Sequence, residues 1–119
     1  MIKVYQYPAC STCKKALAFL RDNNIAFESK NIAEAPPTKD ELREMIERQG
    51  SILPLFNTSG RSYRDGGFSD KVSTMTIEAA IDALSRDGML IKRPFALNEN
   101  HALLGFKPEA WESLKKSGA

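Results

Sequence analysis

Apolar and polar residues alternate at the start of the chain and then repeat with a helical spacing. Residues 2–7 are rich in β-branched and aromatic side chains, which predicts a strand. From Ser11 to about Asn23, apolar side chains recur at i, i+3, i+4 and i+7, which predicts an amphipathic helix. Residues 25–32 predict a second strand. The chain therefore opens β-α-β, and a right-handed crossover would make the two strands parallel.

The middle of the chain carries helical signals. Thr38, followed three residues later by a glutamate, has the spacing of a capping box before a helix that Gly50 closes. Residues 51–75 predict only short helical turns around a loop rich in Gly and Ser, and Thr76 precedes another apolar helical stripe. That stripe comprises Ile77, Ala80, Ile81 and Leu84. We therefore expect residues 33–88 to be mostly helical.

The end of the chain returns to strands. Residues 95–97 and 102–106 flank Asn98-Glu99-Asn100, which is a hairpin signal. Pro108 is well placed as the first residue of a last helix, and Trp111 would pack that helix onto the sheet. His101, beside the turn, is most simply an exposed surface residue.

The order of these elements, β-α-β, helices, β-β-α, matches a thioredoxin-like α/β fold with a mixed sheet. We expect a single domain over residues 1–119. Its core would comprise residues 1–32 and 89–119, and residues 33–88 would form a helical insertion.

Composition restricts the function further. The chain has 119 residues, enough for one core, and its net charge of +2 is too small to indicate direct nucleic-acid binding. The N-terminus does not resemble a signal peptide, and no stretch approaches the length of a membrane span. We therefore expect a monomeric cytoplasmic protein that does not associate with membranes.

The only two cysteines, Cys10 and Cys13, stand three residues apart after the first predicted strand. A thiol at a helix N-terminus faces free backbone N–H groups and the positive end of the helix dipole, which favour the thiolate. One helical turn separates the two sulfurs, so Cys13 can attack a mixed disulfide on Cys10, and Lys14 adds nearby positive charge. Zinc would need two further ligands, and His101 is the only histidine. We expect redox chemistry without a metal or a bound cofactor.

A second group of candidate residues lies late in the chain. Thioredoxin-like folds carry a cis-proline beside the active cysteine, and Pro94 is well placed to be that residue. Arg93 would then project near Cys10 and stabilise its thiolate or hold an anionic substrate, although an ordinary exposed loop arginine is the alternative. The stretch from Asn57 to Arg61 could bind an oxyanion or a glutathione carboxylate. From spacing alone, an ordinary turn describes that stretch better.

Three segments together resemble the glutaredoxin-coupled arsenate reductase family, which also includes the Spx-type transcription regulators. They are YPACSTCKKALAFL, LFNTSGRSYR, and LIKRPFAL followed by LLGFKPEAW. The resemblance covers essentially the whole chain in order. It implies a thioredoxin-like fold with a helical insertion, a catalytic Cys10, an anion-facing Arg93 and a cis-proline at Pro94.

The sequence also departs from that family's pattern. Arsenate reductases of this type use one essential cysteine and three arginines around the oxyanion. Here Asn57 stands at the middle arginine's position, and residues 103–105 contain no arginine at the last one. These reductases usually lack a cysteine at the position of Cys13. The differences favour an intramolecular disulfide cycle over arsenate binding.

We therefore rank a general thiol–disulfide oxidoreductase first, a true arsenate reductase second and a redox-sensing regulator third. Spx-type regulators bind the RNA polymerase α subunit through residues similar to Gly50 and Arg93, but carry a longer basic tail. Glutathione, glutaredoxin or thioredoxin would supply electrons, and a small oxyanion or a disulfide would be the substrate. The expected catalytic residues are Cys10, Cys13 and Arg93. The expected substrate- or anion-binding residues are Ser11, Thr12, Lys14, Asn57 and Pro94.

Overall fold

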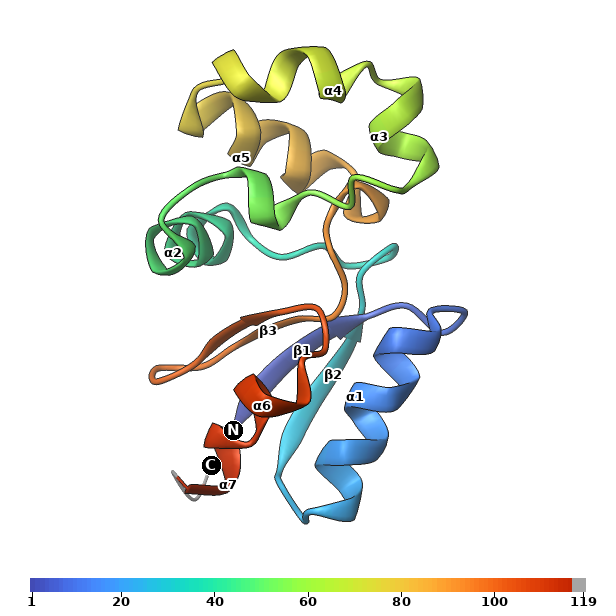
Figure 1. Cartoon of the computed structure of the whole chain (residues 1–119), viewed down its shortest axis with the longest axis vertical. Coiled ribbons are helices and arrows are strands. Elements are labelled where there is room, and N and C mark those ends of the chain that lie inside the picture. Colours follow the sequence, from blue (N-terminus) through green and yellow to red (C-terminus); the bar gives the residue numbers. More distant parts are fainter. Residues whose placement is uncertain (117–119) are drawn as a thin grey trace. The chain divides into compact units, whose positions relative to one another are not determined.

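The computed structural model describes residues 1–116 and separates into two compact units (Figure 1). The first unit comprises Met1–Asn31 and Arg93–Ala119, so it is assembled from both ends of the chain. The second comprises Ile32–Lys92. The predicted α/β fold class, with a mixed sheet, is confirmed, whereas the single-domain assignment stays a prediction.

A four-stranded sheet organises the first unit, in the order β2-β1-β3-β4. Its strands are β1 (Ile2–Gln6), β2 (Phe27–Asn31), β3 (Phe95–Leu97) and β4 (Ala102–Leu104). The pair β1–β2 is parallel, and β1–β3 and β3–β4 are antiparallel. Val4, near the middle of β1, is opposite Ser29 on one side and Ala96 on the other. The parallel pair follows from the helix that connects β1 to β2.

Helices pack against this sheet in the first unit: α1 (Ser11–Asp22), α6 (Pro108–Trp111) and α7 (Ser113–Lys116). Their apolar side chains join those of the strands in one buried cluster. Its members are Ile2, Val4, Ala16, Leu20, Ile25, Ala96, Trp111 and Leu114. The indole N–H of Trp111 donates to the carbonyl oxygen of Gly105 at 3.1 Å, so the ring is buried without leaving its donor unsatisfied. This core anchors α1, the helix whose N-terminus carries the cysteines.

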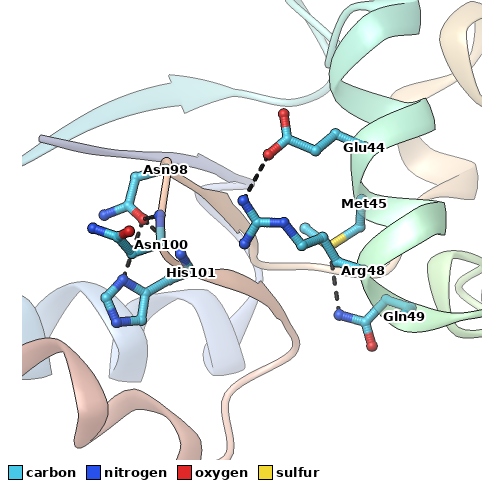
Figure 2. Close-up of polar contacts among 7 residues, drawn as sticks. All are labelled: Glu44, Met45, Arg48, Gln49, Asn98, Asn100 and His101. Carbon is cyan, nitrogen blue, oxygen red and sulfur yellow. Dashed lines mark hydrogen bonds and ion pairs between the residues drawn. The ribbon is translucent and has the colours of Figure 1, made fainter.

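The turn between β3 and β4 is organised by Asn98 (Figure 2). Its Oδ1 accepts the backbone N–H groups of Asn100 and His101 at 2.9 and 2.7 Å, and lies 3.2 Å from Nδ1 of His101. His101 is half-buried, so the expectation of an exposed residue is wrong. The side chain is withdrawn from water because it folds back onto the Asn98 amide.

The second unit consists of helices and short helical turns. They are α2 (Lys39–Gln49), η1 (Leu53–Leu55), α3 (Arg61–Asp65), α4 (Phe68–Lys71), η2 (Val72–Thr74), α5 (Ile77–Arg86) and η3 (Gly88–Leu90). Thr38 and Glu41 form the predicted capping box at the start of α2, with bonds of 3.1 and 2.9 Å. Gly50 ends the helix with φ +85°, a conformation that glycine adopts without strain.

Surface pairs stabilise α2 along its length and join it to α5. Arg48 contacts Glu44 one turn earlier at 2.9 Å, and the Gln49 amide contacts the sulfur of Met45 (Figure 2). The Arg43 guanidinium forms a bidentate pair with Glu78 of α5. The two ion pairs, Arg48–Glu44 and Arg43–Glu78, are exposed, so each contributes little to stability.

Several boundaries differ from the sequence-based expectations. The stretch predicted as a loop contains α3, whose Tyr63 stacks on Phe68 and meets Phe56 edge to face. Ile77, placed in the apolar stripe of α5, is half-exposed because it lies in the first turn. The last helix is divided into α6 and α7. Within residues 1–116, no helix is long and apolar enough to cross a membrane.

Candidate active site

Cys10 is the N-cap of α1. The first strand ends at Gln6, and three further residues lead to Cys10, whose backbone is extended (φ −85°, ψ 114°). Its Sγ accepts the backbone N–H of Cys13 at 3.2 Å, as a cap side chain does. Its own N–H donates to the carbonyl oxygen of Tyr7 at 3.0 Å, which holds the loop in place. The sulfur therefore lies at the positive end of a twelve-residue helix.

Cys13 lies in the first turn of the same helix and is fully buried, whereas Cys10 is half-buried. Both are free thiols. Burial, the largest cause, and the side-chain hydrogen bond with Cys10 together raise the pKa of Cys13 to about 12. Cys13 therefore keeps its proton over the physiological pH range and presents it to Cys10.

The ionisation of Cys10 is set by opposing effects. Partial burial raises the pKa of Cys10, but the hydrogen bonds from the Cys13 thiol and backbone lower it. The charge of Arg93 and a hydrogen bond from its side chain lower the pKa again, and the net result is below the ordinary value of a cysteine thiol. Cys10 is thus the member of the pair that ionises more readily.

Arg93 and Pro94 precede β3, the strand that pairs with β1. The peptide bond between them is cis, in agreement with the prediction for Pro94. Pro94 is buried, and Arg93 is half-buried. The guanidinium carbon of Arg93 lies over the ring of Tyr7, 5.7 Å from its centroid. The pairing of β3 with β1 thus brings an arginine from the end of the chain to a cysteine at its start.

The remaining predicted site residues fall into two groups. Ser11 and Lys14 are exposed on the first turns of α1, and Thr12 is half-buried between them and Cys13. Asn57 belongs to the second unit, so its participation beside Cys10 stays a prediction. There it serves a local turn: its Oδ1 lies 3.4 Å from the Ser59 hydroxyl, and its backbone oxygen accepts the N–H of Gly60.

Tyr7 is a site residue that sequence reasoning missed. The predicted first strand extended to Tyr7, but β1 ends one residue earlier and Tyr7 enters the loop before Cys10. An aromatic residue directly before Pro-Ala-Cys was the available signal. Its hydrogen bond with Cys10 is local, but its contact with Arg93 depends on the pairing of β3 with β1, which the local pattern does not reveal.

This arrangement suits nucleophilic chemistry by a thiolate. The Cys10 sulfur is partly exposed, has a lowered pKa and lies beside Arg93. The Cys13 thiol, whose pKa is raised, lies one helical turn away. Within the described residues, no three His, Cys, Asp or Glu side chains are grouped so that they could hold a metal ion.

Comparison with known proteins finds a family whose model matches this chain and individual proteins with similar sequences. The model of the ArsC family matches residues 5–114. The chain is 38% identical over 109 residues to the uncharacterized protein YusI of Bacillus subtilis, covering 91% of this chain and 92% of YusI. It is 26% identical over 110 residues to the global transcriptional regulator Spx 1 of Lactococcus lactis, covering 92% and 84% of the two chains.

Solved structures give the same picture. The crystal structure of an ArsC family related protein from Bacteroides fragilis is 44% identical and superposes with a TM-score of 0.90, covering 95% of this chain and 96% of that one. A protein from Streptococcus mutans described as a possible arsenate reductase is 38% identical, with a TM-score of 0.88 and coverage of 96% and 97%.

Proposed function

The chain belongs to the ArsC family, and from that membership we propose that it is a thiol–disulfide oxidoreductase in which Cys10 attacks and Cys13 resolves. The observation that carries the proposal is the unequal ionisation of the two thiols. Cys10 has a lowered pKa at the helix N-cap, while Cys13 is buried with a raised one. A structural role for two small buried cysteines would not require this difference.

The reaction begins at the Cys10 thiolate. It attacks one sulfur of a substrate disulfide, forms a mixed disulfide with that half, and releases the other half as a thiolate, which takes up a proton. Cys13 then loses its proton and attacks the Cys10 sulfur. The second substrate thiol leaves, and a Cys10–Cys13 disulfide remains. The substrate is reduced to two thiols while the protein is oxidised.

The first step itself prepares Cys13 for the second. The negative charge and the hydrogen-bond acceptor on Cys10 are among the causes that raise the pKa of Cys13. Both are lost when the Cys10 sulfur enters a mixed disulfide, so the pKa of Cys13 falls at the moment its thiolate is needed. Arg93 is positioned to stabilise the thiolate before the attack and to hold an anionic group of the substrate.

Regeneration requires an external dithiol or two thiols. Glutathione, glutaredoxin or thioredoxin would reduce the Cys10–Cys13 disulfide and become oxidised in turn. We place the protein in the cytoplasm, where the reducing thiol pool keeps such a pair ready for attack. A transient complex with the donor protein is the interaction this function needs.

Arsenate reduction is the second candidate, favoured by the similarity to the Streptococcus mutans protein. Arsenate is an anion, and its attack by a thiolate requires compensating positive charge. In the first unit, Arg93 supplies one such charge beside Cys10. Turnover with arsenate above about 10⁴ M⁻¹s⁻¹ in kcat/KM, within the usual enzyme range, would make this the better assignment.

A regulatory role is a third candidate, favoured by the similarity to Spx 1. In that case the same thiol pair would sense oxidants, and the RNA polymerase α subunit would be the partner. If the chain binds the α C-terminal domain with sub-micromolar affinity through a surface that includes Arg93, Arg93→Glu should abolish that binding. We expect the wild type not to bind the domain with sub-micromolar affinity.

The proposed cycle is tested by trapping. The reduced protein is mixed with oxidised glutathione, quenched with acid, alkylated and measured by peptide mass spectrometry. We expect the wild type to end as an internal disulfide, Cys13→Ser to accumulate glutathione on Cys10, and Cys10→Ser to remain unreacted. Ala18→Ser, an exposed substitution on the same helix, is the matched control. Glutathione retained on Cys10 in the wild type, with Cys13 still free, would contradict the two-cysteine cycle.

A further inference from the structure

Tyr7 contacts three members of the candidate site. Its carbonyl oxygen accepts the N–H of Cys10 at 3.0 Å, and its backbone hydrogen-bonds the thiol of Cys13. Its ring lies under the guanidinium of Arg93, with 5.7 Å between the ring centroid and Cζ. The backbone contacts would survive most substitutions. The ring contact is the part that depends on the side chain.

The contact with the Tyr7 ring restricts the position of the Arg93 side chain. Arginine has a long, flexible side chain, and holding it in one rotamer costs conformational entropy. A guanidinium stabilises a neighbouring thiolate only while it stays close. The face of an aromatic ring attracts the cation, whereas the N–H groups of the guanidinium lie in its own plane. An aromatic platform therefore confines Arg93 without competing for the donors that Cys10 and a substrate need.

We propose that Tyr7 is a positioning residue, whose ring holds the Arg93 guanidinium beside the Cys10 sulfur. The ring, rather than the phenol hydroxyl, does this, because the contact is between the guanidinium carbon and the ring. The half-burial of both side chains keeps water from screening the attraction fully. The proposal rests on the proposed role of Cys10 as the attacking thiol and adds a determinant of its reactivity.

The test follows the alkylation rate of Cys10 against pH, with the modified peptide identified by mass spectrometry. Tyr7→Leu should move the inflection to higher pH and lower the thiolate fraction below it by about two- to fivefold, the effect expected from losing one cation–π contact. Tyr7→Phe keeps the ring and should match the wild type. In a protein that already carries Arg93→Gln, Tyr7→Leu should cause no further change, because its effect passes through the arginine.

A graded series protects the test against misfolding. Phenylalanine with increasing fluorination at position 7 keeps the ring's shape and weakens its negative face, so the Cys10 inflection should rise step by step. An inflection that ignores fluorination, a Tyr7→Phe variant that behaves like Tyr7→Leu, or full additivity with Arg93→Gln would each overturn the proposal. Failure of the proposed function looks different: glutathione would then stay on Cys10 of the wild type with Cys13 free, whichever residue stands at position 7.

Discussion

Replacing Arg93 tests the electrostatics of the site most directly. Arg93→Gln removes the charge and the guanidinium fork but keeps a shorter polar side chain. Two of the causes that lower the pKa of Cys10 come from Arg93, its charge and its hydrogen bond. The partial burial that raises the pKa stays in place. The pKa of Cys10 must therefore move upward in the variant.

The magnitude follows from the contact that is lost. A hydrogen bond to a charged group contributes about 1.5–3 kcal/mol. Cys10 is half-buried, so solvent screens part of this, and the lower end of the range applies. That corresponds to about a tenfold smaller thiolate fraction below the pKa. A thiolate whose thiol has the higher pKa is intrinsically more nucleophilic. On a logarithmic scale, this gain in nucleophilicity offsets about half of a tenfold loss in the thiolate fraction. Alkylation below the pKa should therefore slow by about threefold.

The assay is alkylation by iodoacetamide across a pH series, with the pKa taken from the inflection of the rate. Lys92→Gln is the matched control, since it removes an exposed positive charge at the neighbouring position. It should leave the inflection unchanged. Equal shifts in both variants would mean that general surface charge, not the placement of Arg93, sets the reactivity of Cys10. An unchanged inflection in Arg93→Gln would refute the reasoning outright.

Two predictions concern stability. Trp111→Phe leaves the carbonyl of Gly105 without its buried donor and shrinks a core side chain, so urea unfolding should show a loss of about 1–3 kcal/mol. A loss below about 0.5 kcal/mol in the free energy of unfolding would mean that the indole ring of Trp111 contributes little to the stability of the core. In the reduced protein, folded Cys13 stays protonated up to about 12, whereas an unfolded cysteine ionises near 9.0. Between these values the unfolded chain binds fewer protons. The stability contribution is therefore complete below about pH 9 and falls as the pH rises. Cys13→Ala should therefore lose less stability than the wild type as the pH rises from about 9 towards 12, and parallel declines in urea midpoints would contradict the assignment.

The regular elements of the fold were predictable where the pattern was local. The stripe of α1 and the capping box at Thr38 both depend on residues within a few positions of each other. The short helix α3 was not, because RSYRD has no helical periodicity of its own. Tyr63 is held by contacts with Phe56 and Phe68, seven positions before it and five after it. Packing between aromatic rings on separate elements supplied what local propensity lacked.

The candidate site was predictable only in part for a related reason. Cys10 at the helix N-terminus follows from a strand that ends before Pro8 and a helical stripe that begins after it. The approach of Arg93 depends on β3 pairing beside β1, which neither segment encodes alone. It was the resemblance to a known family that supplied this contact in advance. The platform provided by Tyr7 was missed because a tyrosine at a strand end is ordinarily assigned to the strand.

The asymmetry of the two thiols has its origin in the geometry of a helix start. An N-cap side chain lies outside the helical cylinder and accepts backbone N–H groups, which favours the anion. Three residues later the side chain has turned toward the core, where burial favours the neutral thiol. The pKa of the same residue type is thus shifted in opposite directions over one helical turn. Because the outer sulfur is the more accessible and has the lower pKa of the two, the proposed order of attack, Cys10 first and Cys13 second, follows from the geometry of the helix start.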